Sequence, residues 1–92
     1  MTFPMDRRIA KSGKLAAQER DDEAYVLTLT DTTLHYLGDI ETFIWKALDG
    51  SLTGEQMVTL VCSEYEVDRT VAERDLPEFL GKMEAAGLIS LS

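Results

Sequence analysis

Residues 25–50 read YVLTLTDTTLHYLGDIETFIWKALDG, and this stretch decides the fold of the chain. It begins with two runs of β-forming residues, 25–29 and 34–37, joined by the polar segment 31–33. β-Branched and aromatic side chains fit a pleated, half-buried surface, and two such runs with a short polar link are typical of a hairpin. We therefore predict an antiparallel pair of strands over this region.

The same stretch continues with the period of an amphipathic helix. Gly38-Asp39 interrupts the strand pattern, and Asp39 is of a residue type that caps helix N-termini. Apolar residues then follow at helical spacing, with a tryptophan beside them: Ile40, Phe43, Ile44, Trp45, Ala47 and Leu48. Asp49-Gly50 ends the pattern, because glycine readily adopts the left-handed conformation that follows many helices. We predict a helix over 39–48 whose Ile44 and Trp45 belong to the core.

Two further helices are predicted downstream. Residues 53–56 (TGEQ) have the T-x-x-Q form of a capping box, and apolar residues continue at helical spacing to Tyr65. Asp68 or Thr70 can cap a third helix that runs to about residue 86.

Proline complicates the third helix. Pro77 lies inside the helical pattern, where a proline removes one main-chain hydrogen bond. Either the helix bends at Pro77, or its regular part begins near Asp75. Leu80 is expected in the core, and so is Leu88 in the short extended segment 88–91 that follows.

The N-terminal part of the chain is less regular. Residues 1–8 (MTFPMDRR) predict a flexible tail, and residues 9–92 a single domain, since 92 residues are too few for two cores. Residues 9–18 fit a weak helix or a short irregular strand, because Gly13 disfavours the helix. Two or three antiparallel strands followed by three helices make a small α+β domain of winged-helix type.

The charge is uneven along the chain. The net charge is −8; residues 1–20 carry five bases and two acids, whereas residues 21–92 carry four bases and fifteen acids. An acidic body repels a phosphate backbone, which requires clustered Lys and Arg. A winged-helix DNA-binding regulator is an alternative suggested by the outline, but its third helix is net acidic and would be repelled from the major groove. We therefore expect no nucleic-acid partner.

No group of residues indicates catalysis. Cys62 adjoins the apolar Leu60-Val61 pair and is interpreted as a packing residue, and His35 lies within the predicted hairpin. One His and one Cys are too few for a zinc site, and no glycine-rich phosphate loop occurs. We expect a protein that is not an enzyme and needs neither metal nor cofactor. Without a signal segment or a long apolar run, we expect it to be cytoplasmic, with no membrane partner.

A strand edge is the remaining candidate for function. A sheet of two or three strands leaves one strand uncovered, and such an edge can accept a peptide as an added strand. Alternation places Leu34 and Tyr36 on one face of the sheet and His35 and Leu37 on the other. Three helices can cover only one of these faces. Either Leu34, Tyr36 and Phe79 are simply core residues, or the uncovered set lines a groove.

Several segments together resemble a known family. They are YVL (25–27), LHYLG (34–38), IWKALDG (44–50), Tyr65, and DLPEFLGKMEAAGLI (75–89). Their order and spacing resemble the PqqD-like domain, also called the RiPP recognition element, over about residues 9–91. The chain departs from the family pattern at Gly38, where Asn is usual, and at Pro77.

This resemblance implies a three-stranded antiparallel sheet followed by three helices, without catalytic activity. Members of the family bind the leader segment of a ribosomally synthesised precursor peptide by strand addition and deliver it to a maturation enzyme. The leader would lie between strand 33–37 and helix 71–86. The peptide-binding residues implied are Thr33, Leu34, His35, Tyr36, Leu37, Arg74, Asp75, Glu78, Phe79 and Lys82.

The resemblance also gives these residues roles. Leu34, Tyr36 and Phe79 would form apolar pockets, and the charged residues would pair with leader side chains at the rim. Arg74 and Lys82 locally offset the acidity of the body, which suggests an acidic leader.

The residues of the hairpin turn indicate the biosynthetic pathway in which such a protein would act. Pyrroloquinoline quinone chaperones usually have a Y-P-E-G-like turn there, whereas residues 30–33 read TDTT. This difference favours a free-standing protein of lasso-peptide biosynthesis, whose partner would be a transglutaminase-like leader peptidase. The alternative is a PqqD-type chaperone for a radical SAM peptide-modifying enzyme.

Overall fold

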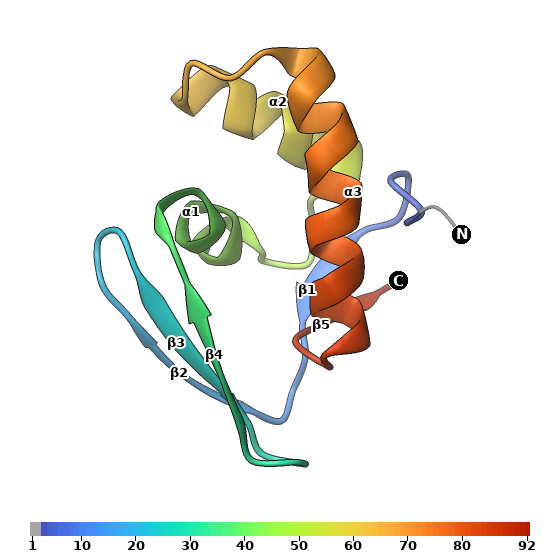
Figure 1. Cartoon of the computed structure of the whole chain (residues 1–92). Helices are drawn as coiled ribbons and strands as arrows, with labels where there is room; N and C mark the ends of the chain where they lie inside the picture. The colour runs from blue at the N-terminus through green and yellow to red at the C-terminus, as the bar shows by residue number, and fades with distance from the viewer. Residues whose placement is uncertain (1–2) are drawn as a thin grey trace.

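The predicted hairpin is part of a three-stranded antiparallel sheet in the computed structural model, which describes residues 3–92. The elements follow in the order β1 (Ile9–Lys11), β2 (Leu15–Glu19), β3 (Ala24–Thr28), β4 (Thr33–Leu37), α1 (Asp39–Ala47), α2 (Gly54–Glu64), α3 (Arg69–Ala85) and β5 (Ile89–Leu91). The main sheet has the order β2-β3-β4, and the helices lie on one side of it (Figure 1). The α+β class, with three antiparallel strands followed by three helices, is confirmed.

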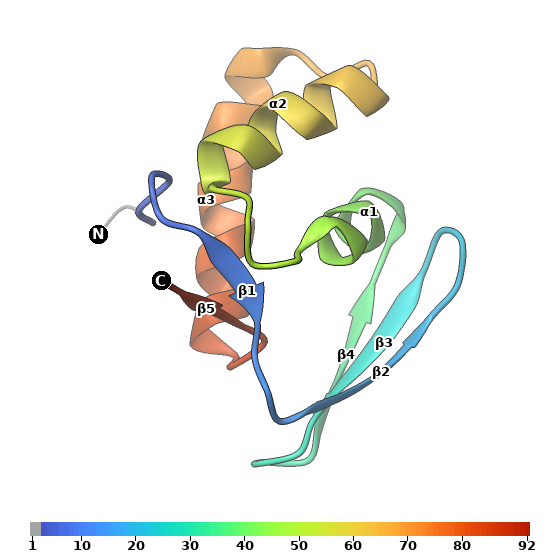
Figure 2. The same cartoon turned by 180° about the vertical axis from the view of Figure 1, so that it is seen from behind.

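Residues 9–18, for which the sequence fits either a weak helix or a short irregular strand, contribute to two strands. β2 pairs with β3 in the main sheet, whereas β1 pairs antiparallel with β5 in a separate two-stranded sheet, with Ile9 opposite Leu91. Figure 2 shows β1 and β5 side by side, next to α3 and apart from the main sheet. The first strand of the chain thus closes the domain onto its last strand.

Most of the expected N-terminal tail is packed against the domain. Residues 1 and 2 lie outside the described residues, but the side chain of Phe3 is only 7% exposed. The Met5 carbonyl accepts a hydrogen bond from the Glu55 amide, and the Arg7 side chain donates one to the Ser92 carbonyl. The packing is made by the side chains of Phe3 and Met5, by the Arg7 side chain and by main-chain hydrogen bonds, none of which forms a periodic pattern in the sequence.

The helices begin at the predicted capping signals, with one change. Thr53 and Asp68 are the N-caps of α2 and α3, and their side chains accept hydrogen bonds from the Gln56 and Thr70 amides. The N-cap of α1 is Gly38, one residue before the expected Asp39, and the side chain of Glu41 accepts from the Gly38 amide at 2.8 Å.

Proline does not delay the third helix. Helix α3 runs from Arg69 to Ala85 with Pro77 inside it, so its regular part begins six residues before Asp75. The other alternative, a bend of the helix at Pro77, stays a prediction. None of the helices in residues 3–92 is long and apolar enough to cross a membrane.

The core lies between the three helices, the inner face of the main sheet and the β1–β5 pair. The expected core residues Ile44, Trp45, Leu80 and Leu88 are all at most 2% exposed. The largest fully buried side chains are Trp45, Ile9, Ile44, Met57, Leu80, Val26, Val58, Val61 and Thr42.

Polar contacts of α1 attach the helices to the sheet. The Trp45 indole N–H donates to the Glu19 carboxylate of β2 at 2.9 Å, and the Lys11 ammonium lies 5.0 Å from the centre of the Trp45 ring. At the end of β4, the buried Thr42 hydroxyl donates to the Leu37 carbonyl at 3.1 Å. Both strands at the edges of the sheet are therefore tied to the same helix.

The turn between β3 and β4 is organised by Asp31. Its carboxylate accepts hydrogen bonds from the Thr28 hydroxyl and the Thr33 amide. The bond from Thr28 is the main reason that the pKa of Asp31 is lowered, partly opposed by desolvation. Thr32 has φ 55°, a left-handed conformation that is unfavourable for a β-branched residue.

Replacement of Thr32 by Gly should stabilise the protein. Glycine adopts positive φ without strain, and the gain, net of its higher unfolded-state entropy, should be up to about 1 kcal/mol in the free energy of unfolding. Urea denaturation followed by circular dichroism measures it. Thr30→Gly, at an exposed turn position without positive φ, is the control and should be slightly destabilising. Equal losses for both variants would contradict a strained Thr32.

Replacement of Trp45 by Phe should destabilise the protein. It removes the donor to Glu19 and part of a fully buried side chain, which should cost about 1–3 kcal/mol in the free energy of unfolding. Glu19→Gln keeps an acceptor oxygen for the indole and should cost clearly less. The same denaturation measurement compares the two, and a larger loss for Glu19→Gln would assign the effect to the carboxylate charge.

Candidate functional site

Strand β4 has two chemically different faces. Leu37 is 4% exposed and His35 is half-buried, on the side of the helices. Leu34 and Tyr36 are 63% and 58% exposed, so their side chains lie on the opposite, outer face. The predicted alternation along β4 is therefore present, with His35 and Leu37 on the covered face.

The free edge of β4 is formed by the main chain of Leu34 and Tyr36. The hydrogen bonds from the Arg20 amide to Glu23 and from the Leu29 amide to Lys14 show that odd-numbered residues of β3 bond toward β2. Even-numbered residues of β3 then bond toward β4, where their partners are Thr33, His35 and Leu37. The amides and carbonyls of Leu34 and Tyr36 point the other way, to the uncovered edge.

A groove lies between this edge and α3. Its main part has a volume of about 340 Å³, with β4 on one side and Phe79, Lys82 and Met83 of α3 on the other. A second hollow of about 300 Å³ continues it along α3 to Asp75 and Glu78. Both parts share Glu41, Phe79 and Lys82, so they form one channel, which we call the β4–α3 groove.

Most of the predicted peptide-binding residues line this groove. Leu34, His35, Tyr36, Leu37, Asp75, Glu78, Phe79 and Lys82 all do so. Thr33 and Arg74 do not line it. Thr33 lies at the turn, where its amide donates hydrogen bonds to the Thr28 hydroxyl and the Asp31 carboxylate, and Arg74 is exposed on α3.

The apolar wall of the groove differs from the expected one. Its buried side chains are Leu37, Met83 and Leu88, beside the half-buried Phe79. Leu34 and Tyr36 reach the groove only from the strand edge, because their side chains are mostly on the outer face.

Four residues of the groove were missed by the site prediction: Glu41, Met83, Ala86 and Leu88. Met83 belongs to the apolar stripe of the third helix and Leu88 to the predicted core, so hydrophobic spacing could have indicated both. Glu41 lies in the first turn of α1, and no local signal places it near α3.

The charge at the rim of the groove also differs from the predicted one. Arg74 pairs with Asp75 at 3.0 Å, and Lys82 pairs with Glu78 at 3.3 Å. The hydrogen bond and charge of Asp75 raise the pKa of Arg74. Both bases are thus compensated within α3, and with Glu41 the groove is lined by three acids and one base. The expected cationic docking point for an acidic leader is absent from this part of the described chain.

His35 has an unusual environment. Its Nε2 atom is shielded from solvent and has no hydrogen-bond partner within the described residues. A general base of a hydrolase would need an orienting carboxylate, and no hydrogen bond between His35 and a carboxylate occurs in residues 3–92. The imidazole lines the groove with this nitrogen atom unpaired.

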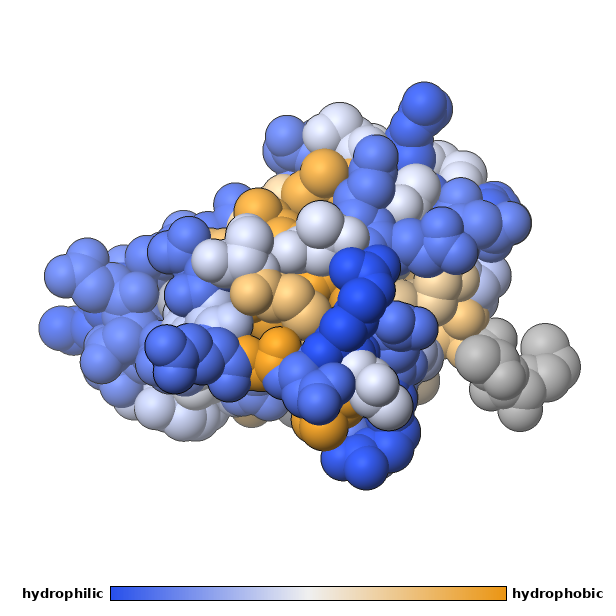
Figure 3. Space-filling model, turned by 90° about the horizontal axis from the view of Figure 1, so that it is seen from above, coloured by the Kyte–Doolittle hydropathy of each residue, from blue (hydrophilic) through white to orange (hydrophobic). Residues whose placement is uncertain are grey.

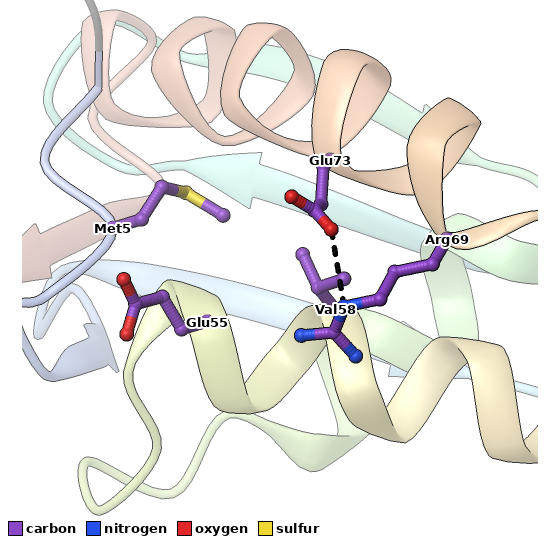
Figure 4. Close-up of a pocket in the computed structure, with 5 residues that line it drawn as sticks. All are labelled: Met5, Glu55, Val58, Arg69 and Glu73. Carbon is purple, nitrogen blue, oxygen red and sulfur yellow. Dashed lines mark hydrogen bonds and ion pairs between the residues drawn. The ribbon is translucent and has the colours of Figure 1, made fainter.

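Another pocket lies between the N-terminal segment, α2 and α3. It has a volume of about 240 Å³ and is lined by Met5, Glu55, Val58, Arg69 and Glu73 (Figure 4). The Arg69–Glu73 ion pair, at 3.0 Å, joins two residues one turn apart on α3 and forms one wall of the pocket. It holds no nucleophile, and residues 3–92 contain no cluster of three metal-ligating side chains. The β4–α3 groove is therefore the better candidate site.

The fold and site define a class of small α+β domain with an open sheet edge beside a helix, suited to bind an extended segment. A profile of coenzyme PQQ synthesis protein D (PqqD) matches residues 23–89, and the chain belongs to this PqqD family. The resemblance inferred from the sequence is confirmed.

A solved structure supports the same relationship. The chain is similar to TbiB1 in complex with the TbiA(beta) leader peptide, with a TM-score of 0.81 and 32% identity over 88% of this chain and 94% of that one. No curated protein matches the chain significantly.

The main-chain directions along β4 predict a pattern of hydrogen exchange. In the free protein, the amides of Leu34 and Tyr36 should exchange rapidly, whereas those of His35 and Leu37 should be protected by β3. Exchange of the assigned amides in D₂O, followed by NMR, measures this. The opposite alternation would show that Thr33, His35 and Leu37 form the free edge.

Proposed function

We propose that this protein is a non-catalytic, cytoplasmic recognition protein. It binds the leader segment of a ribosomally synthesised precursor peptide by strand addition to β4 and delivers it to a maturation enzyme. The observation that carries the proposal is the free main-chain edge of Leu34 and Tyr36 facing a groove with apolar side chains. The family and the similarity to a leader-peptide complex support it.

The groove provides both parts of such recognition. The main chain of Leu34 and Tyr36 gives hydrogen bonds that any extended peptide can make, and this contributes affinity without selectivity. Inward-facing leader side chains would contact Phe79, Met83 and Leu88, which select apolar residues. A polar leader atom near His35 would satisfy its unpartnered Nε2.

The maturation enzyme we favour is a lasso-peptide leader peptidase. This choice rests on the TDTT turn and on the similarity to TbiB1. The second candidate is a PqqD-type chaperone for a radical SAM enzyme, which the description of the matching family favours. A gene for a transglutaminase-like protease or for a radical SAM enzyme beside this one would separate them.

A DNA-binding regulator is less well supported. All three bases of α3, Arg69, Arg74 and Lys82, are paired with acids of the same helix. Such a helix would meet the phosphate backbone without free positive charge.

Leader binding should remove the alternation of fast and slow amide exchange along β4. Addition of the leader of the precursor peptide encoded beside this chain should protect the amides of Leu34 and Tyr36 and leave His35 and Leu37 as they were. The TbiA(beta) leader serves as a second probe. A cognate leader that bound without protecting these two amides would place the site elsewhere, and one that did not bind would contradict the function.

Phe79 should be the main side-chain contact of the leader. Phe79→Ala should weaken leader binding by about 5- to 30-fold, because a half-buried aromatic side chain at a groove wall commonly contributes about 1–2 kcal/mol. Isothermal titration calorimetry measures the change. Val71→Ala, on the same helix outside the groove, is the matched control and should leave the affinity unchanged.

A further inference from the structure

The outer face of the main sheet is unusually apolar. Six large hydrophobic residues are exposed in the described chain, and four of them belong to β3, β4 or the turn between them: Tyr25, Leu29, Leu34 and Tyr36. Tyr25 and Tyr36 are cross-strand partners whose ring centres are 5.3 Å apart. These four residues, with the half-buried Leu27 between them, are called the outer face.

No element of the described chain covers this face. The helices and the β1–β5 pair all lie on the opposite side of the main sheet (Figures 1 and 2). An exposed apolar surface concentrated on one side of so small a domain is typical of an interaction site.

Acidic residues dominate the border of the outer face at the β2–β3 turn. This turn contains Asp21, Asp22 and Glu23 beside one base, Arg20, which pairs with Glu23 at 3.8 Å. At the other end, Asp31 of the β3–β4 turn is balanced by Lys14, which lies opposite Leu29. Hydrophilic side chains crowd the end of the molecule formed by the β2–β3 turn, on the left of Figure 3. The Tyr36 hydroxyl donates to the Glu23 carboxylate at 3.4 Å. Desolvation, and then the charge of Glu23, raise the pKa of Tyr36, so the field of this turn reaches the outer face.

This border determines the kind of partner that fits. A second copy of the chain would bring two acidic borders together, each on a protein of charge −8. Like charges face to face oppose association, whereas a partner with Lys and Arg around an apolar centre is attracted. The charge therefore favours a different protein over self-association.

The outer face continues into the peptide-binding edge. A leader added beside β4 would become the fourth strand of the sheet, and every second side chain of the leader would lie next to Leu34 and Tyr36 on the outer face. A partner that docks on this face would contact the leader and the protein together.

We propose that the outer face, extended by the bound leader, is the docking surface for the maturation enzyme, which contacts it through an apolar patch bordered by basic residues. The inference rests on the proposed function, because it requires a leader on β4. It explains how the enzyme distinguishes the loaded protein from the empty one, since only the loaded protein presents the complete surface.

The first test uses two residues that lie on the outer face and do not line the groove. The double variant Tyr25→Ser/Leu29→Ser should bind the co-encoded leader within about twofold of the unchanged protein, because neither side chain touches the groove. The purified maturation enzyme encoded beside this chain should bind the loaded variant at least about tenfold more weakly. The control is Ile40→Ser/Val71→Ser, which removes the other two exposed apolar side chains and should change neither affinity.

The second test addresses the acidic border. Asp21→Lys/Asp22→Lys should weaken enzyme binding, and raising the salt concentration should weaken binding of the unchanged protein. Glu66→Lys, an exposed acid after α2, is the charge control. Stronger enzyme binding by the double lysine variant would contradict the proposal that basic residues border the apolar patch of the enzyme.

The outcomes separate this inference from the proposed function. Unchanged enzyme binding by Tyr25→Ser/Leu29→Ser, with normal leader binding, would overturn the docking surface alone. If the enzyme bound the empty and the loaded protein with equal affinity, the bound leader would not be part of the docking surface. A dimer of the unchanged protein in sedimentation, lost in the serine variant, would identify a second copy as the occupant instead. Failure of the unchanged protein to bind the leader would contradict the proposed function itself.

Discussion

The buried indole of Trp45 is the constraint on which the arrangement of the domain depends. A tryptophan placed in the core must have a partner for its N–H, and here the partner is Glu19 of β2. The hydrogen bond holds the far strand of the sheet to α1, while Thr42 holds the end of β4 to the same helix. Helix α1 therefore sets where β4 lies relative to α3, and with it the width of the groove. Because the groove lies between the edge of β4 and α3, a third element, α1, is needed to hold these two at a fixed distance.

The free edge exists because of how the ends of the chain pair. β1 lies close enough in sequence to join the main sheet, but it pairs with β5 and leaves β4 uncovered. Exposed edges invite aggregation, and short length and nearby charge are the usual protections. β4 has five residues, and Glu41, Asp75, Glu78 and Lys82 stand across from it. The edge is thus accessible to one extended segment while being unsuitable for continuous sheet growth.

Local patterns in the sequence were enough to predict the hairpin, the three helices and the core positions of Trp45 and Leu80. Period, capping residues and β-propensity act over a few residues, so they can be read without the fold. The pairing of β1 with β5 joins residues about 80 positions apart, and nothing local indicates it. The prediction of free positive charge at the rim of the groove was wrong for a different reason. Composition alone treats Arg74 and Lys82 as free bases, but helical geometry brings Glu78 next to Lys82, and the adjacent Asp75 pairs with Arg74.

The energetics of strand addition explain why the groove needs its apolar wall. Ordering a peptide segment of five residues, the length of β4, costs about 5–10 kcal/mol in backbone entropy. Leu34 and Tyr36 offer two amides and two carbonyls, and four such hydrogen bonds contribute only about 2–6 kcal/mol in water. Main-chain pairing alone therefore does not hold a leader. The difference must come from apolar burial against Phe79, Met83 and Leu88, so the side chains of α3, more than the strand that the peptide joins, decide which leader binds.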